Sequence, residues 1–206
     1  MKRKIITTGD GSRTIQIEDW DEQYHSKHGA IQEAYHVFIK NGLSLFSDRK
    51  ITILEIGFGT GLNAFITFLE GRKKKLAIDY YGVEAFPVGN EELEQLNYVE
   101  ALKAEAFSKE FELMHNCPWG KVAAISTLFN LYKQQKEFSE INDTKLFNLI
   151  YFDAFGARVQ PELWTEKIFQ KMFDALKDNG VLVTYSAKGS VRRAMQAVGF
   201  VVERLP

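Results

Sequence analysis

The chain has 206 residues, a length that allows one globular domain with a substantial buried core. Its 45% hydrophobic and 26% charged residues are ordinary for a globular protein, and no run of about 18 apolar residues predicts a membrane span. The net charge of -1 excludes a strong overall basic field, so any nucleic acid would have to bind a local patch. The single cysteine, Cys117, excludes an internal disulfide, and the basic N-terminus is not followed by an apolar run, which together indicate a cytoplasmic protein.

The first part of the chain predicts a hairpin and then an alternation of strands and helices. In chain order we expect hairpin strands over 4–7 and 14–17, a helix over 29–46, a strand over 51–56, a helix over 62–69, a strand over 76–83, a helix over 89–108 and a strand near 127–132.

The second part continues the same alternation. We expect a strand over 146–152, a helix over 161–176 with Asn179-Gly180 as its stop, a strand over 181–185, a helix over 190–198 and a strand starting at 200–203. This order predicts a single α/β domain over 1–206 with a mostly parallel, doubly wound sheet. Residues 1–46 form a hairpin and helix extension, and residues 47–206 form a Rossmann-like core whose last strand is expected to be missing.

A glycine-rich segment lies between the first core strand and the helix after it, and reads Glu55-Ile56-Gly57-Phe58-Gly59-Thr60-Gly61-Leu62-Asn63. Glycines let the backbone approach a ligand closely, and the start of a helix offers unpaired N–H groups. The spacing G-x-G-x-G differs from the G-x-G-x-x-G of many dinucleotide sites, and tight turns alone also need glycine. The predicted cofactor-binding residues here are Glu55, Gly57, Phe58, Gly59, Gly61 and Asn63.

An acidic residue ends the second core strand. Glu84 lies 23 positions after Gly61, where a carboxylate can accept hydrogen bonds from both hydroxyls of a ribose. The alternative is a solvated carboxylate at a strand end. With the glycine loop, Glu84 and the adjoining Ala85 predict a cofactor that contains a nucleoside.

Asp153 follows the apolar strand over 146–152 and is followed by Ala154-Phe155. A carboxylate there cannot stay buried and unpaired without a large cost in free energy. It either caps the loop by accepting backbone N–H groups, or it faces a reaction centre above the carboxyl ends of the strands.

These segments resemble the methyltransferase domain of MnmC and its stand-alone relatives. The matching segments are Tyr24-His25-Ser26, Gly29-Ala30 with Glu33, His36-Val37-Phe38, Leu54 to Asn63, Val83 to Pro87, Phe152 to Phe155, Pro161 to Thr165, Gly180 to Tyr185, and Val191-Arg192-Arg193 before Gly199-Phe200. They run in order through nearly the whole chain. The glycine loop and the pair Asp-Ala-Phe with Pro-Glu-Leu-Trp-Thr are fairly specific, whereas the 180–185 match is generic.

The resemblance implies a class I S-adenosylmethionine-dependent methyltransferase. It implies methylation of the primary amine of 5-aminomethyl-(2-thio)uridine at the wobble position of tRNA. Asp153 then lies beside the transferred methyl group, as catalytic and cofactor-binding residue, and Glu137 binds the adenine amino group. The residues expected at the substrate are Ser26, Glu33, Phe155, Trp164 and Arg192. Packing in the core remains an alternative for Phe155 and Trp164, as does an exposed helix position for Glu33.

Three features depart from the family pattern. One is Glu137, which stands where the family tends to have Asp. After Asp-Ala-Phe, relatives have a small residue, then Pro and later Lys, whereas this chain has Gly156-Ala157-Arg158-Val159-Gln160. Arg158 is a candidate for the missing positive charge. The Gly-rich end that carries Lys and Arg in relatives is also missing after Leu205-Pro206.

Other functions remain open at this point. A methyltransferase for a small-molecule or protein amine is the first alternative, and a regulatory protein that binds S-adenosylmethionine without turnover is the second. We expect no metal, because His25, His28 and His36 are accompanied by no cysteine or clustered carboxylates. The oligomeric state stays open. The candidates for a tRNA-binding basic surface are Lys2, Arg3, Lys4, Lys188, Arg192 and Arg193.

Overall fold

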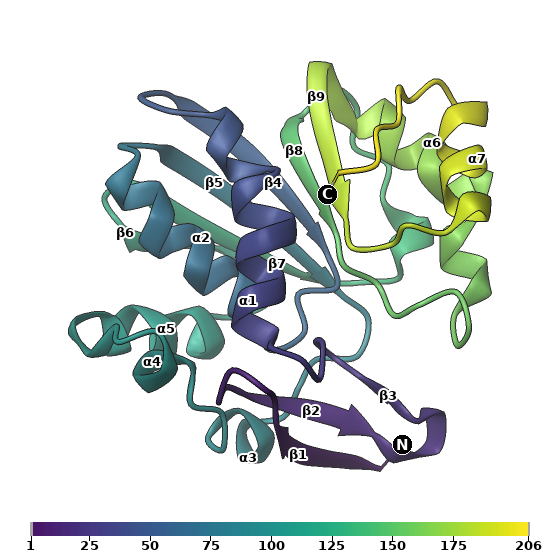
Figure 1. Cartoon of the computed structure of the whole chain (residues 1–206). Coiled ribbons are helices and arrows are strands. Elements are labelled where there is room, and N and C mark those ends of the chain that lie inside the picture. The colour runs from purple at the N-terminus through teal and green to yellow at the C-terminus, as the bar shows by residue number, and fades with distance from the viewer. Residues whose placement is uncertain (1, 206) are drawn as a thin grey trace.

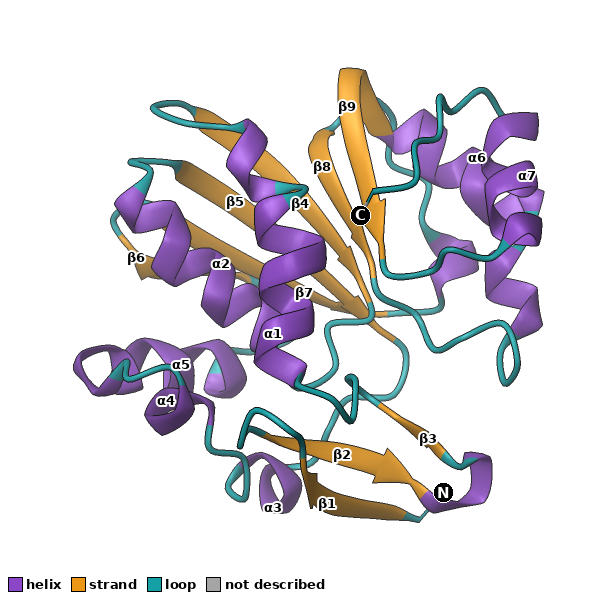
Figure 2. Cartoon of the chain, in the orientation of Figure 1, coloured by secondary structure: helices purple, strands orange, loops and turns teal. Residues whose placement is uncertain are grey.

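The computed structural model describes residues 2–205, which form a six-stranded sheet with helices on both faces and a smaller three-stranded sheet (Figures 1 and 2). The strand order in the larger sheet is β6-β7-β5-β4-β8-β9. Its strands are β4 (Lys50–Ile56), β5 (Ala77–Glu84), β6 (Val122–Ser126), β7 (Phe129–Gln135), β8 (Phe147–Phe152) and β9 (Leu176–Thr184). All neighbouring strands are parallel except β6, which pairs antiparallel with β7. The predicted Rossmann-like α/β fold is confirmed.

Strand β4 shows how the sheet buries both faces. Ile51 and Ile53 join one apolar cluster, whereas Leu54 and Ile56 join the other, because successive side chains of a strand point to opposite faces. The first face is covered by α1 (Ala30–Ala34), α2 (Leu62–Lys73), α4 (Tyr98–Ala101) and α5 (Ser108–Asn116), and the second by α6 (Glu166–Ala175) and α7 (Gly189–Ala197). Within residues 2–205, no helix is both long enough and apolar enough to cross a membrane.

The smaller sheet lies at the carboxyl edge of the larger one (Figure 1). Strands β1 (Arg3–Thr7) and β2 (Arg13–Ile17) form the predicted hairpin, and β3 (Glu22–Gln23) adds an antiparallel strand that the sequence did not indicate. Asn97 fastens this sheet to the core. Its Oδ1 accepts a hydrogen bond from the N–H of Arg13 at 2.7 Å, and its Nδ2 donates to the carbonyl of Gly11 at 3.1 Å.

The expected helix over 89–108 is wrong. The chain instead forms α3 (Asn90–Leu93), α4, a 3-10 turn at Glu105–Phe107 and then α5, which the sequence analysis did not expect. Asn97 uses its side chain on the smaller sheet, and Lys103 has a left-handed backbone with φ of 52°, so the helix is interrupted at both places.

Two other expected helices are shorter than predicted. The helix over 29–46 consists of α1, a π-helical turn over Tyr35–Lys40 and a 3-10 turn over Leu43–Leu45. The helix over 161–176 begins as a 3-10 turn over Pro161–Trp164, and α6 ends at Ala175. Asn179, the expected stop, instead lies inside β9 with φ of 62°, where the register against β8 is irregular.

The expected strand starting at 200–203 is also wrong. Residues 200–205 belong to no strand in the described part of the chain. The N–H of Phe200 donates to the carbonyl of Met195 at 3.2 Å, and its ring packs edge-on against Phe173 with centroids 5.1 Å apart. The chain therefore packs on α6 and α7 directly after Gly199, and residues 200–205 form no strand pairing with β9.

Candidate active site

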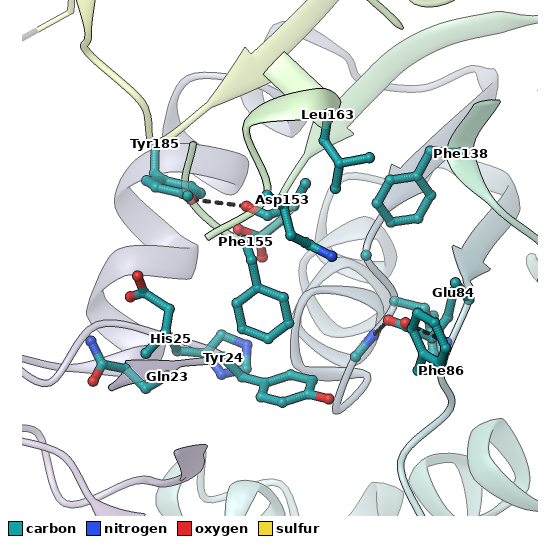
Figure 3. Close-up of a pocket in the computed structure, with 18 of the residues that line it drawn as sticks. Gln23, Tyr24, His25, Glu84, Phe86, Phe138, Asp153, Phe155, Leu163 and Tyr185 are labelled. Atoms are coloured by element: carbon teal, nitrogen blue, oxygen red, sulfur yellow. Dashed lines mark hydrogen bonds between the residues drawn. The ribbon is translucent and has the colours of Figure 1, made fainter. Parts of the chain in front are cut away.

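A cavity of about 770 Å³ opens between the carboxyl edge of the larger sheet and the smaller sheet (Figure 3). Its floor comes from three strand ends: the glycine loop after β4, Glu84 at the end of β5, and Asp153 after β8. Its opposite wall comes from residues 22–28 of the N-terminal segment. Open α/β sheets bind ligands at this edge, so the fold places the cavity where a cofactor is expected.

Two glycines of the loop cannot be replaced without disturbing the cavity. Gly57 has φ of +88°, and a Cβ there would lie 2.7 Å from the carbonyl oxygen of Asp153. Gly59 has φ of +48°, and its Cβ would lie 3.0 Å from the ring of Tyr24. Both positions therefore need glycine for backbone conformation and for space.

Glu84 is held in place by the backbone of two loops. Its Oε2 accepts the N–H of Gly59 at 3.1 Å, and its Oε1 accepts the N–H of Phe86 at 3.0 Å. Burial raises the pKa of Glu84, although these backbone hydrogen bonds oppose the shift. Each carboxylate oxygen keeps a second lone pair, so Glu84 can still accept a hydroxyl from a ligand in the cavity.

Asp153 is the central acid of the cavity. Its Oδ2 accepts a hydrogen bond from Nδ2 of Asn63 at 2.8 Å. Burial, reinforced by the negative charge of Glu33, raises the pKa of Asp153 to about 8, and the Asn63 hydrogen bond opposes the shift. Burial also raises the pKa of Glu33, whose Oε2 accepts the N–H of Ser26 at 2.9 Å. We name Asp153 and Glu33 the acidic corner of the cavity. Two neighbouring carboxyl groups attract a cation to this place.

Glu55 lies behind the acidic corner, in the interior of the protein and close enough to Asp153 for their charges to interact. Its side chain is 1% exposed and does not line the cavity. Burial, followed by the charge of Asp153, raises the pKa of Glu55 well above its usual range. Two carboxyl groups that interact in a buried place hold a proton more readily than either would alone.

An aromatic wall faces Asp153 (Figure 3). The ring of Phe155 makes edge contacts with Tyr24, at 4.9 Å between centroids, and with Trp20, at 5.6 Å. The guanidinium of Arg3 lies 5.8 Å from the centre of the Tyr24 ring. We name Trp20, Tyr24 and Phe155 the aromatic wall.

Most of the predicted site residues line this one cavity. They are Ser26, Glu33, Gly57, Phe58, Gly59, Asn63, Glu84, Ala85, Glu137, Asp153 and Phe155. Their individual roles stay predictions. Four other predicted residues, Glu55, Gly61, Trp164 and Arg192, do not line it.

Glu55 lies behind the cavity, as described above, and the other three residues have different surroundings. Gly61, at the start of α2, packs against the ring of His115. Trp164 is 7% exposed, lies in the core against Phe152, and donates from Nε1 to the carbonyl of Phe155 at 2.7 Å, so it supports the aromatic wall from behind. Arg192 is exposed on α7 and lines a separate groove along β9.

The sequence analysis missed several lining residues. Trp20 lies in the 3-10 turn after the N-terminal hairpin, and Arg3, which the sequence analysis named only as a candidate for a basic surface, lies in β1. Docking of this segment at the carboxyl edge of the larger sheet brings both to the cavity. Tyr185 follows β9, and its hydroxyl donates to the carbonyl of Ala154 at 2.8 Å. The sequence signal for Tyr185 was its place after a core strand, since side chains that follow parallel strands gather at the same edge.

Comparison with known proteins supports the resemblance to methyltransferases. A family model described as S-adenosyl-L-methionine-dependent methyltransferase matches residues 122–206. The chain is 30% identical, over 90% of its length, to the tRNA 5-methylaminomethyl-2-thiouridine biosynthesis bifunctional protein MnmC of Idiomarina loihiensis. It is 25% identical over 98% of its length to the protein of that name in Leptospira interrogans. The resemblance to MnmC is confirmed. The chain covers only 34% and 33% of these two relatives, respectively.

Solved structures agree on the fold. The chain superposes on MnmC2 of Aquifex aeolicus with a TM-score of 0.75 and 24% identity, covering 97% of this chain and 65% of that one. Spermidine synthase of Thermotoga maritima gives a TM-score of 0.51 at 13% identity, over 96% of this chain and 63% of that one. The chain therefore has the α/β fold that these two structures share.

The cavity fits S-adenosylmethionine, the cofactor of this methyltransferase family. Gly57 and Gly59 leave backbone space that a Cβ would fill. Asn63 is 3% exposed, and its Oδ1 has no hydrogen-bond partner among the described residues, so it can accept a bond from an ammonium or hydroxyl group. The acidic corner suits a ligand that carries positive charge. Residues 2–205 contain no group of three or more His, Cys, Asp or Glu side chains placed to hold a metal ion.

Proposed function

We propose that this chain methylates the primary amine of 5-aminomethyl-(2-thio)uridine at the wobble position of tRNA, with S-adenosylmethionine as the methyl donor. The proposal also places the protein in the cytoplasm. The observation that carries it is the opening of Asp153, the glycine loop and the aromatic wall onto one cavity. The names of the MnmC relatives, with which the chain shares a third of their length, supply the substrate.

The acidic corner performs the proton chemistry in this proposal. S-adenosylmethionine, when bound, supplies an activated methyl group that needs no metal. An alkylammonium has no lone pair, so it must lose a proton before it attacks. Asp153 binds the ammonium, accepts or relays that proton and orients the neutral nitrogen. A carboxyl whose pKa is about 8 exchanges protons readily near neutral pH.

The aromatic wall positions the substrate. A uracil ring that leaves the anticodon stack needs an apolar surface, and aromatic side chains provide one in single-stranded RNA recognition. Phe155 is two residues from Asp153, so a ring that packs on this wall keeps its aminomethyl group near the carboxylate. Burial in the cavity also removes water from the nucleophile.

Mass analysis of wobble nucleosides tests the proposal. The protein is incubated with S-adenosylmethionine and tRNA that carries the unmethylated aminomethyl group, and with a free alkylamine as a control. We expect the methylaminomethyl nucleoside to form while the free amine stays unchanged. Methylation of the free amine without the tRNA product would favour a small-molecule methyltransferase, and methylation of neither would favour a binding protein.

A further inference from the structure

One arginine joins the loop after β8 to the N-terminal sheet. A single nitrogen of Arg158, Nη2, lies 2.7 Å from the carbonyl oxygen of Trp20, 3.0 Å from that of Asp21 and 3.1 Å from Oε2 of Glu22. These partners are 136 to 138 residues away in sequence. Arg158 therefore closes a contact between the segment that carries Asp153 and Phe155 and the turn that leads from β2 to β3.

The turn that Arg158 holds is strained. Asp21 has left-handed backbone angles, φ of 46° and ψ of 47°, which cost energy for any residue with a Cβ. Hydrogen bonds donated by a charged group are stronger than neutral ones, so the guanidinium stabilises the two carbonyls of this turn. The ion pair with Glu22 contributes less, because the side chain of Arg158 is 56% exposed and solvent screens it.

The segment around this turn carries two of the three rings of the aromatic wall, Trp20 and Tyr24. Trp20 ends the 3-10 turn Glu18–Trp20 just before Asp21, and Tyr24 directly follows β3. Both rings meet Phe155, which stands three residues before Arg158. The hydrogen bonds of Arg158 therefore fix the distance between the two sides of the wall.

We infer that Arg158 is a positioning residue that fastens the β2–β3 turn over the cavity, so that the aromatic wall is assembled for a planar pyrimidine ring. The inference rests on the proposed function. Arg158 touches neither the reacting amine nor the cofactor loop, and its guanidinium is engaged with the acceptors of the turn. Loosening the turn weakens capture of the ring but leaves the acidic corner and the glycine loop intact.

The test compares Arg158→Ala, Arg158→Lys and Glu22→Gln with the wild type in the full chain. Arg49→Ala is the control, because Arg49 is also exposed but precedes β4 at the opposite edge of the sheet. Each variant is measured for KM and kcat with aminomethyl-containing tRNA, for the Kd of S-adenosylmethionine, and for amide hydrogen exchange over residues 18–24.

For Arg158→Ala we expect the KM for tRNA to rise about tenfold, with kcat and the cofactor Kd changed by less than about twofold. Exchange over residues 18–24 accelerates. Arg158→Lys restores part of the affinity, since it keeps one charged donor. Glu22→Gln leaves hydrogen exchange over residues 18–24 close to that of the wild type, since both carbonyl bonds of Arg158 remain. Arg49→Ala matches the wild type.

Two results would overturn the inference. Unchanged hydrogen exchange in Arg158→Ala would show that the turn does not depend on this arginine. Faster exchange with an unchanged KM would show that the turn does not position the substrate. A wild type that binds cofactor but methylates no tRNA would instead count against the proposed function. The hydrogen-exchange data would then decide on their own whether Arg158 fastens the β2–β3 turn.

Discussion

At the scale of single residues, Asp153 is the acid that carries the proposed chemistry, and its neighbours set its charge. It accepts a hydrogen bond from Asn63 and feels the negative charge of Glu33, in a place where burial already favours the protonated form. A cationic ligand reverses this balance, since a nearby positive charge favours the carboxylate. In the proposed reaction, the same acid therefore binds an ammonium and takes its proton.

Replacing Asp153 by Asn keeps the shape of the side chain and removes its charge. We expect kcat for tRNA methylation to fall by about 100- to 10,000-fold, the range for loss of a general base, while the cofactor Kd changes much less. Single-turnover kinetics and calorimetric titration measure the two quantities. Asp48→Asn is the matched control, because Asp48 is exposed and precedes β4 at the far edge of the sheet. Full activity of Asp153→Asn would remove this residue from the mechanism.

The raised pKa of Asp153 also predicts how stability depends on pH. Its pKa is about 8 in the folded protein against an ordinary value of 3.8, so the folded state holds the proton more tightly than the unfolded state. This group therefore costs increasing stability as the pH rises from about 4 to about 8. We expect Asp153→Asn to unfold at a higher temperature than the wild type, by a margin that widens from pH 5 to pH 8. A margin independent of pH in thermal scans would contradict the assignment.

At the scale of elements, the site depends on strand ends that approach one another closely. A Cβ on Gly57 would lie 2.7 Å from the carbonyl oxygen of Asp153, so Gly57→Ala pushes the ends of β4 and β8 apart. We expect it to cost about 1–3 kcal/mol of stability and to raise the cofactor Kd more than about tenfold. Gly120→Ala separates the effect of backbone conformation from the effect of close approach. Gly120 also has positive φ, +75°, but a Cβ added there would have no atom within 4 Å. Gly120→Ala should lose stability without losing cofactor affinity. An equal rise of the cofactor Kd in both variants would refute the role of close approach.

Residues at the ends of core strands could be predicted from the sequence, whereas residues brought in by the docking of the N-terminal sheet could not. Glu84 and Asp153 were found because each follows an apolar run, and parallel strands bring such positions to one edge. Trp20 and Arg158 were not placed, because their contact spans 138 residues and depends on how the N-terminal sheet docks. Trp164 lies in the core, the alternative that the sequence left open, with its ring packed inward while its Nε1 donates a hydrogen bond to the loop. Local patterns do not reveal which side of a turn faces a cavity.

At the scale of the whole molecule, the net charge of -1 provides no overall positive field. The proposed binding of RNA therefore depends on cations that are grouped locally on the surface. The six cations proposed from sequence lie in separate places: Arg3 lines the cavity, whereas Lys188 and Arg192 line the groove along β9. Lys27 and Lys167 also line the cavity, are exposed, and form no ion pair with another described residue.

Charge reversal tests which of these cations meet the tRNA. We expect Lys27→Glu or Lys167→Glu to raise the KM for tRNA and to reduce the slope of log Kd against log salt by about one. Arg192→Glu, exposed on α7 in the groove along β9, should leave both unchanged. Filter binding between low and physiological salt measures the slopes. The opposite order of effects would move the RNA-binding surface to the groove along β9.

The most direct test of the whole account is transfer of a labelled methyl group to two synthetic anticodon stem-loops. They differ only at the wobble uridine, which carries a 5-aminomethyl group in one and no substituent in the other. The account predicts label in the aminomethyl stem-loop alone, at a rate that falls at least about 100-fold when Asp153 is replaced by Asn. Equal labelling of both stem-loops, or labelling by Asp153→Asn at the wild-type rate, would contradict it.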